Sequence, residues 1–388
     1  MKPAFEYDQL YKLEVIKETK RWMKSAFITR GQFDAISEAY KVLFYHPNLM
    51  IRVLLFVATL LGLSGVSGLF FLVFVSAGED LLAALCVVYG IASFLVLEML
   101  FIKNNHYKSG VTEALLYHAC GFTIGGIAGL ANFDSVSLVV WTCVLVFSFA
   151  AIRYLDLLTT AAAVLSFAYT LFHELYSLGG IVQQLIPFFF ILVFTPIYFY
   201  VKQLKQKEAL RVWTYNLIVI ESICLLLIYC GGNYLVVREL SVELIELVIE
   251  PGSDLPFAFI FYALTVIIPV AYLYFGIKNK DVVLLRVSLL VVAFSVFTFK
   301  YYYSFGHPEI TLTIGGAVVL AITIWLMNYL KIIQHGYTRE NLLSEKWANT
   351  NAQAFLVSQT MGGNQQPTDL ADVPGGGSSA GGGSTDSF

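Results

Sequence analysis

Three polar side chains lie inside apolar segments of the sequence, where such groups often have a function. Glu221 stands about eleven residues into the apolar run 210–231, roughly 16 Å along a helix that rises 1.5 Å per residue. Thr214 falls on the same helical face, about 20° away. A carboxylate at this depth costs a few kcal/mol to insert, and such groups often carry protons or cations. Glu221 is therefore a candidate coupling residue, and a protonated Glu221 that bonds a neighbouring helix is the structural alternative.

The third polar side chain, His118, lies about 10 Å into the run GVTEALLYHACGFTIGGIAGLA (110–131). On a helical wheel Glu113 is about 140° from His118. Three glycines share the face of His118: Gly121, Gly125 and Gly129. Their two GxxxG spacings predict close packing against another helix. His118 then either hydrogen-bonds across that contact or relays protons with Glu221.

A second group of ionisable residues falls at the ends of apolar runs, at one cytoplasmic level: Glu98, Glu113, Arg153, Asp156 and Arg286. Opposite charges at this level predict ion pairs that hold helix ends together. A polar vestibule for a solute or a lipid headgroup is the alternative.

The familiar motifs of catalysis and metal binding are absent from the sequence. FHELYS (172–177) begins like the zinc motif HExxH, but Ser177 stands where the second His is needed. The five cysteines include no CxxC pair. The sequence therefore predicts no catalytic residue, no metal and no cofactor, and a protein without enzymatic activity is favoured over an enzyme.

Long apolar helices must position these residues. The chain has 388 residues, of which 58% are hydrophobic and 13% are charged, whereas soluble domains have about 25% charged residues. Apolar runs long enough to cross a hydrocarbon core of about 30 Å fall at about 51–76, 81–102, 111–131, 136–152, 155–173, 179–201, 210–231, 255–276, 282–299 and 309–330. The predicted fold class is an all-α, polytopic integral membrane protein with about ten transmembrane helices. Only IRYLD (152–156) divides the fourth run from the fifth, so nine and eleven spans stay open.

The basic residues predict the orientation of these spans. If both termini are cytoplasmic, only Arg238 and Lys300 of the 24 Lys and Arg residues lie outside, as the positive-inside rule requires. The membrane domain then covers residues 50–331. It includes an outer interfacial helix at about 237–250, where acidic residues alternate with apolar ones.

The remaining segments are predicted to be cytoplasmic. Residues 1–49 form a short helical hairpin, whose second helix starts at Thr29 with Gln32 three residues later, the spacing of a capping box. Residues 332–360 are predicted to form an amphipathic helix. Residues 361–388 are rich in Gly and Ser, and this composition predicts a disordered tail.

The order of motifs near the N-terminus resembles a known family. Trp22 is followed by FITRGQFDAI (27–36), by HPNLMIRVLLFVATLLGLSGVSGLFFL (46–72) and by a long series of apolar runs. Over residues 10–80 this order is similar to a bacterial group of predicted multi-pass membrane proteins, the domain of unknown function 2157 type. The resemblance implies a bacterial inner membrane. It transfers no functional residues, because that family has no settled activity.

These observations favour a carrier or permease for a small solute or ion, with proton coupling through Glu221. One alternative is a structural or regulatory membrane protein that recruits a protein partner through its cytoplasmic termini. A membrane enzyme acting on lipid or glycan is the third hypothesis. The expected partners are the lipid bilayer, a small solute or ion, and a protein at the cytoplasmic termini. Nucleic acid is not expected, because no basic face is interleaved with aromatic residues.

Overall fold

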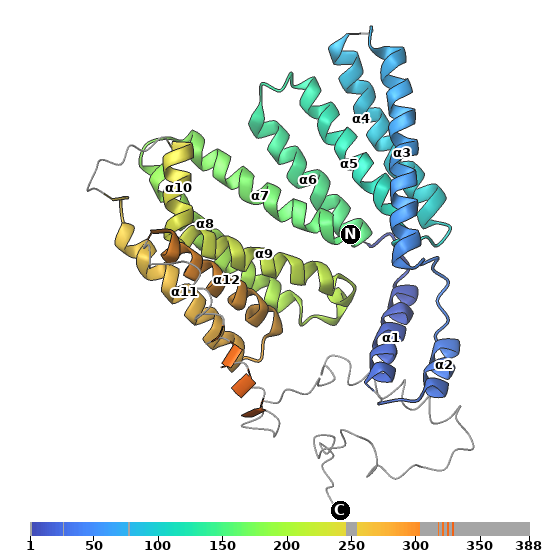
Figure 1. Cartoon of the computed structure of the whole chain (residues 1–388). Coiled ribbons are helices and arrows are strands. Elements are labelled where there is room, and N and C mark those ends of the chain that lie inside the picture. The colour runs from blue at the N-terminus through green and yellow to red at the C-terminus, as the bar shows by residue number, and fades with distance from the viewer. Residues whose placement is uncertain are drawn as a thin grey trace, which may run out of the picture. The chain divides into compact units, whose positions relative to one another are not determined.

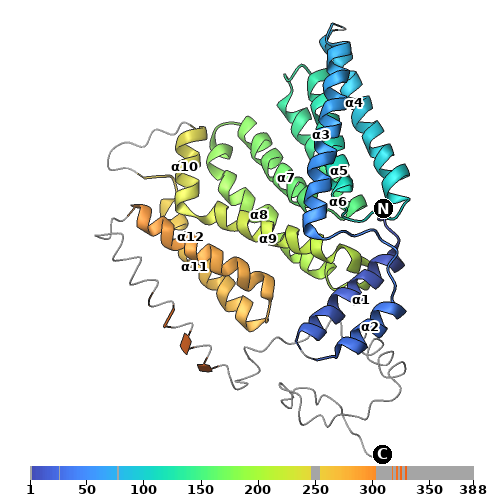
Figure 2. The ribbon, with the colours of Figure 1, turned by 45° about the vertical axis from the view of Figure 1, so that its right-hand side comes forward.

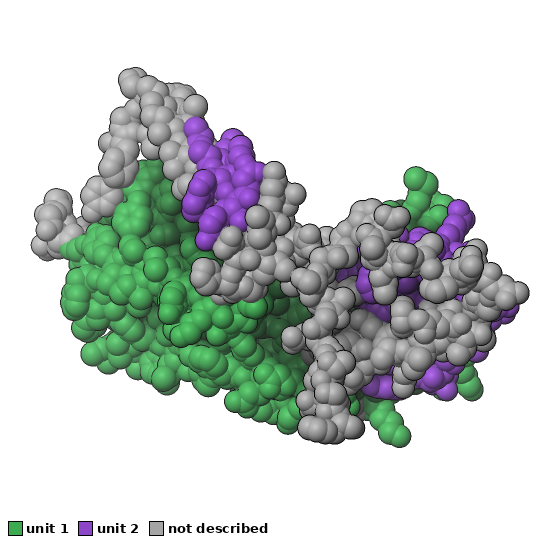
Figure 3. All heavy atoms as spheres, turned by 90° about the horizontal axis from the view of Figure 1, so that it is seen from below, with its two compact units in different colours: residues 1–5, 44–306 green, residues 6–43, 307–388 purple. Residues whose placement is uncertain are grey.

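The computed structural model of the chain describes residues 2–25, 27–76, 78–245 and 254–302, together with separate positions between 317 and 329. Most of the tenth predicted span (309–330), the predicted helix 332–360, the predicted tail 361–388 and the end of the predicted outer helix lie outside the described residues. The chain divides into two compact units (Figure 3). The first unit contains residues 1–5 and 44–306, and the second contains residues 6–43 and 307–388.

The second unit contains the helical hairpin that the sequence predicts. Helices α1 (Tyr7–Lys24) and α2 (Arg30–Ala39) pack on each other. Gln32 N donates to Thr29 Oγ1, and Thr29 N donates to Gln32 Oε1, so the predicted capping box is confirmed. The buried core of the hairpin consists of Val15, Trp22, Ile28 and Ile36.

The described part of the first unit contains nine long helices between residues 49 and 302 (Figure 1). They are α3 (Leu49–Phe74), α4 (Glu79–Val96), α5 (Val111–Leu130), α6 (Val136–Tyr154), α7 (Leu157–Ser177), α8 (Ile181–Leu204), α9 (Thr214–Gly232), α11 (Ala258–Lys278) and α12 (Val282–Tyr302). A π-helical turn, η1 (Leu97–Ile102), extends α4, and a 3₁₀ turn, η2 (Glu208–Trp213), precedes α9. The shorter α10 (Tyr234–Ile245) follows α9, in the region of the predicted outer helix.

These helices correspond to the first nine predicted apolar runs. The segment IRYLD does separate two helices, because Leu155 has a left-handed backbone (φ 56°) and the Asp156 side chain caps the first turn of α7. A left-handed residue cannot continue an α-helix, and a capping carboxylate favours a new one.

Seven of the described helices are long and apolar enough to cross a membrane: α3, α4 with η1, α6, α8, α9 with η2, α11 and α12. The other two long helices are less apolar, since α5 contains Glu113 and His118, and α7 contains His173 and Glu174. Helix α3 exposes large side chains along its length, including Leu54, Leu61 and Leu72. Such a surface suits lipid contact.

Consecutive helices pack as pairs: α4 with α5, α6 with α7, α8 with α9, and α11 with α12 (Figures 1 and 2). Helix α5 also packs on α3 and α6, and α9 packs on α7 and α12. The ends of α8, α9 and α12 are thereby brought together. The buried core between α7, α8, α9, α11 and α12 includes Phe194, Cys224, Leu225 and Val291.

The packing of α4 on α5 corrects the predicted glycine stripe. A Cβ atom at Gly126 would lie 2.6 Å from Val87 N, and one at Gly129 would lie 2.9 Å from the Ala83 Cβ. A Cβ atom at Gly121 or at Gly125 would meet no described atom within 4 Å. The reason is the helical rotation of about 100° per residue, which turns Gly125 away from the contact that Gly126 makes. Among the described residues the predicted GxxxG packing therefore fails for Gly121 and Gly125, and only Gly129 of the three packs against α4.

Candidate functional site

A buried ion pair joins the end of α8 to the middle of α9. Lys205, the residue that follows α8, donates a hydrogen bond from Nζ to Glu221 Oε2. The Glu221 side chain is 0% exposed and that of Lys205 is 18% exposed. Glu221 Oε1 is also buried, and it has no hydrogen-bond partner among the described residues. Half of this carboxylate is therefore unsatisfied, which is unusual for a buried polar group.

A second ion pair lies nearer the surface. Lys202 Nζ is 2.9 Å from Asp281 Oδ2, and these side chains are 31% and 11% exposed. Asp281 Oδ1 accepts hydrogen bonds from the N–H groups of Val283 and Leu284, 3.1 Å each, and so caps α12. We call the four residues Lys202, Lys205, Glu221 and Asp281 the lysine–carboxylate cluster. Lys202 is the most exposed side chain of the cluster and Glu221 the least exposed. The Lys202–Asp281 pair, called the outer ion pair, is therefore more accessible to water than the Lys205–Glu221 pair.

The sequence explains why the cluster forms. Lys202 and Lys205 are three residues apart at the C-terminal end of α8, where cations are favoured by the helix dipole and lie on one face. Asp281 stands at the N-cap of α12, a preferred position for Asp. Burial raises the pKa of the Asp281 carboxyl, but the hydrogen bonds from Lys202 and from the Leu284 N–H lower it, and the net pKa is below its usual value.

Thr214, the predicted neighbour of Glu221, does not join the cluster. It is the first residue of α9, and its hydroxyl donates to the carbonyl oxygen of Arg211 at 2.7 Å. Because α9 begins at Thr214, Glu221 lies seven residues, or about 10 Å, from the start of the regular α-helix. The Lys205 side chain meets it there.

His118 lies in different surroundings from Glu221. Its ring contacts those of Tyr89 on α4 and Phe122 on α5, with centroid separations of 5.3 and 4.4 Å. It lines a wide, open groove of about 420 Å³ together with Phe71, Cys86, Phe122 and the glycines Gly121, Gly125 and Gly126. The Nε2 atom is buried without a described partner. Since His118 contacts α4 and Glu221 binds the residue after α8, these contacts do not support a direct proton relay between them.

Glu98 and Arg153 form a two-point ion pair between η1 and α6. Arg153 Nε donates to Glu98 Oε1 at 2.8 Å, and Nη2 donates to Oε2 at 3.0 Å. Arg153 Nη1 also donates to the carbonyl oxygens of Lys2 (3.0 Å) and Pro3 (3.3 Å). Ala4 N donates to the Arg153 carbonyl oxygen at 2.7 Å. The pair therefore joins two helices and also holds residues 2–4.

Glu113 is the centre of a second network at the start of α5. Arg52 on α3 donates to Oε1, while Gly110 N (2.8 Å) and Thr112 Oγ1 (2.9 Å) donate to Oε2. Both oxygens of this buried carboxylate are thus satisfied. We call Arg52, Gly110, Thr112 and Glu113 the Glu113 network. Its bonds fasten the start of α5 to α3.

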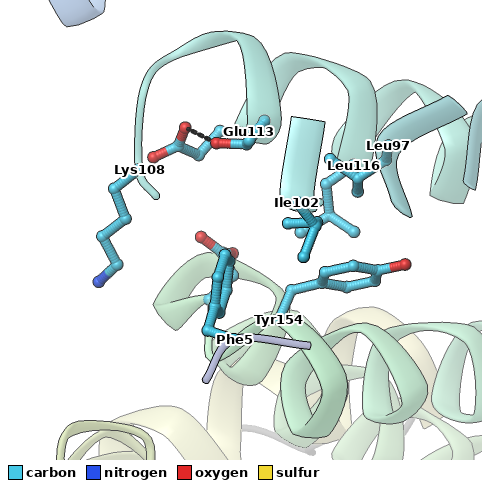
Figure 4. Close-up of a pocket in the computed structure, with 9 residues that line it drawn as sticks. Phe5, Leu97, Ile102, Lys108, Glu113, Leu116 and Tyr154 are labelled. Carbon is cyan, nitrogen blue, oxygen red and sulfur yellow. Dashed lines mark hydrogen bonds between the residues drawn. The ribbon is translucent and has the colours of Figure 1, made fainter. Parts of the chain in front are cut away.

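Asp156 and Phe5 close the space beside this network. Asp156 accepts hydrogen bonds from Thr159 N (2.8 Å) and Tyr117 Oη (3.1 Å). A cavity of about 20 Å³ separates Phe5 and Tyr154 from Ile102 and Leu116 (Figure 4). That volume holds about one water molecule. This cavity therefore has no room for a solute, and Glu98 and Glu113 each form an ion pair between helix ends.

The remaining residue of the predicted level, Arg286, belongs to none of the ion pairs described above. It is exposed on α12, and no ion pair or hydrogen bond with a described residue involves it. Four partners in these ion pairs were not predicted from the sequence: Lys202, Lys205, Asp281 and Arg52. Lys202 and Lys205 entered the prediction only as two of the basic residues that indicate how the spans are oriented. Their three-residue spacing before a turn could have indicated a cationic site.

No group of three or more His, Cys, Asp or Glu residues within the described residues is arranged to hold a metal ion. Comparisons of the chain with protein-family models, with curated proteins and with solved structures found no match. The resemblance to the domain of unknown function 2157 family stays a prediction.

Proposed function

We propose that the protein is a membrane carrier for a small solute or ion, coupled to protons through Glu221. The observation that supports this most strongly is the fully buried Glu221 carboxylate, which has Lys205 on one oxygen and no described partner on the other. A buried carboxylate that is only partly satisfied can exchange a proton or a cation when its surroundings open. On this proposal the chain crosses a bacterial inner membrane about ten times, with both termini in the cytoplasm.

Purified protein in liposomes tests the proposal. Solute accumulation driven by an inward proton gradient is measured for the wild type, for Glu221→Gln and for Glu79→Gln as the matched control. Glu79 is exposed at the start of α4, so its amide variant changes the same chemistry without touching the cluster. We expect proton-driven accumulation to fall at least ten-fold in Glu221→Gln and to persist in Glu79→Gln. Accumulation that is indifferent to Glu221→Gln would refute the proposal.

A regulatory protein is the second candidate function, and the attachment of residues 2–5 favours it. Besides the bonds to Arg153, the Phe5 ring packs edge-on against Tyr107, with centroids 4.8 Å apart. Phe44 stacks on the same Tyr107 at 5.1 Å. Phe5 and Phe44, which flank the segment 6–43, thus both contact the Tyr107 ring. A partner that binds the helical hairpin would pull on these two contacts.

The two candidate functions differ in cells. A regulatory protein loses its phenotype when residues 1–45 are deleted and keeps it in Glu221→Gln. A carrier loses its phenotype in Glu221→Gln.

A membrane enzyme has less support than either, because it needs polar residues that converge. Glu98 and Glu113 each bind a different arginine, and Arg286 forms no ion pair with either.

A further inference from the structure

Arg286 lies on the face of α12 that suits contact with lipid. The exposed residues of this helix include Arg286, Leu289 and Leu290, and the two leucines are 65% and 58% exposed. Residues three and four apart share one face of a helix, so the arginine and the leucines belong to one surface. Arg286 stands four residues after Val282, where α12 begins, which places it about 6 Å from the end of the helix. A charged group is thus located at the edge of an apolar, exposed surface.

Arg286 has no carboxylate partner in the part of the chain that the structure describes. Helices α9 and α11 pack against α12, and the acidic residues of these three helices and the turn before α12 are Glu221 and Asp281. Lys205 binds Glu221, and Lys202 binds Asp281. A basic side chain near a helix end extends towards the headgroup region, because its charge is costly in hydrocarbon. The guanidinium group of Arg286 is therefore available to an anion at that level.

Lys278 brings a second positive charge to the same end of the hairpin that α11 and α12 form (Figure 2). The two helices are close there, because a Cβ atom at Gly276 would lie 3.0 Å from Leu285 Cγ. Lys278 follows Gly276 by two residues, towards the turn. Arg286 follows Leu285 by one residue, away from the turn. At 1.5 Å per residue the two basic residues differ by only about 4.5 Å along the helix axes, a difference that their long side chains can span.

The exposed residues of α11 have the same order of charge and apolar surface. Lys278, Tyr274 and Val270 are exposed and recur every four residues, so they share one face. Lys278 Nζ lies over the Tyr274 ring, 5.7 Å from its centroid. Tyrosine is typical of the membrane–water interface, where its hydroxyl group reaches the polar headgroups. Both helices therefore carry a cation near the turn and apolar side chains further from it.

We propose that this end of the α11–α12 hairpin binds an anionic phospholipid, with Arg286 and Lys278 as the ligands of its phosphate group. A guanidinium group binds phosphate through two parallel hydrogen bonds, and an ammonium group adds a point charge. The acyl chains then lie along the exposed apolar residues beside the two cations, which include Leu289, Leu290 and Val270. Anionic headgroups are favoured over zwitterionic ones, because a zwitterionic headgroup carries a cation that Arg286 and Lys278 repel. The proposal does not depend on the proposed carrier function.

Native mass spectrometry of the purified full-length protein measures this preference. The protein is titrated with phosphatidylglycerol and, separately, with phosphatidylcholine that has the same acyl chains. We expect phosphatidylglycerol to bind with a dissociation constant at least five-fold lower. Glycerol 3-phosphate, which has a phosphate group but no acyl chains, should not displace it at equal concentration. Equal affinity for the two lipids would overturn the proposal, and so would displacement by glycerol 3-phosphate, because the site would then be one for a free phosphate.

Variants assign the preference to the two basic residues. Arg286→Gln should reduce the preference for phosphatidylglycerol at least three-fold, and the double variant Arg286→Gln with Lys278→Gln should abolish it. Arg286→Lys keeps the charge but loses the two parallel hydrogen bonds, so its preference should be intermediate. Lys300→Gln is the matched control, because Lys300 lies at the opposite end of the same helix. An equal loss in Lys300→Gln would contradict the proposal, since any positive charge on α12 would then serve.

The stability of the variants provides a second measurement. Arg286 and Lys278 are exposed and take part in no ion pair with a described residue, so the double variant should unfold at the wild-type temperature in detergent without added lipid. Added phosphatidylglycerol should raise the unfolding temperature of the wild type more than that of the double variant, because a ligand stabilises the state that binds it. A folded double variant that keeps the full preference for phosphatidylglycerol would refute the assignment of Arg286 and Lys278.

Discussion

The Glu113 network and the lysine–carboxylate cluster each bury a glutamate near a helix end, and each pairs it with a basic residue from another segment. They differ in how completely the carboxylate is satisfied. Glu113 accepts three hydrogen bonds, from Arg52, Gly110 and Thr112, and both of its oxygens are used. Glu221 accepts one described bond, and Oε1 accepts none.

This difference separates a structural ion pair from a candidate for transport. A saturated buried carboxylate has no free position for a proton or an ion, and its bonds stabilise one arrangement of the helices. A carboxylate with an unused oxygen keeps a cost of burial that a ligand can relieve. The Glu113 network should therefore determine stability, and the lysine–carboxylate cluster should determine transport.

Gly110→Ala tests the rigidity of the Glu113 network and should have the largest effect. Gly110 has φ +90°, and a Cβ atom there would lie 2.1 Å from the Arg52 carbonyl oxygen and 2.9 Å from Phe56 N. Backbone atoms cannot rotate away as a side chain can, so the loss should exceed the about 1–3 kcal/mol typical of overpacking. We expect little folded protein by fluorescence-detected size exclusion.

Gly121→Ala is the control for this substitution. A Cβ atom at Gly121 would meet open space, and Ala is the better helix former. Its thermal unfolding should match or exceed that of the wild type. Equal folded yields for Gly110→Ala and Gly121→Ala would show that the start of α5 is not fixed against α3.

Glu113→Ala compared with Glu221→Gln tests the difference between the two regions directly. Removal of Glu113 leaves Arg52 and two other donors without their partner, and the loss of one member of a buried pair costs about 3–5 kcal/mol. We expect a large fall in the thermal unfolding temperature of the detergent-purified protein, with proton-driven uptake per folded molecule unchanged. Glu221→Gln should lower the unfolding temperature less, because the amide oxygen can still accept a hydrogen bond from Lys205, and it should lose proton-driven uptake. Reversed results would exchange the roles of the two regions.

The sequence was sufficient to predict the helices but only part of these two regions. Length and hydropathy located nine helices, because the rise per residue and the thickness of a bilayer determine how long an apolar run must be. Glu113, Glu98 and Arg153 were expected to pair at helix ends, and each is in an ion pair, although Glu113 binds Arg52.

Partners on other helices could not be predicted in the same way. Whether Lys205 bends back to Glu221 depends on the 3₁₀ turn η2, which delays the start of α9. The face of α5 that meets α4 is set by tertiary packing, so the GxxxG spacing gave Gly121 and Gly125 instead of Gly126. A helical wheel gives the directions of side chains, and the neighbour in each direction depends on the rest of the fold.

Asp281→Asn should have the smallest effect, and the pH dependence of that effect tests whether the Asp281 charge holds Lys202. Asn caps helices about as well as Asp, so the substitution removes mainly the ion pair with Lys202, worth about 1 kcal/mol. The folded pKa of Asp281 is below its usual value, because the hydrogen bonds from Lys202 and Leu284 N outweigh burial. A lowered folded pKa means that the stabilisation is fully present above the unfolded pKa of about 3.9 and is lost as the pH falls through the folded pKa.

Thermal unfolding of wild type and Asp281→Asn in detergent, compared between pH 7 and pH 3, measures this loss. The difference should be constant from about pH 7 to pH 5 and should shrink below about pH 4. Asp80→Asn, at an exposed position near the start of α4, should show no difference from the wild type over the same range. A difference for Asp281→Asn that persists unchanged at pH 3 would mean that the charge of Asp281 is not what Lys202 recognises.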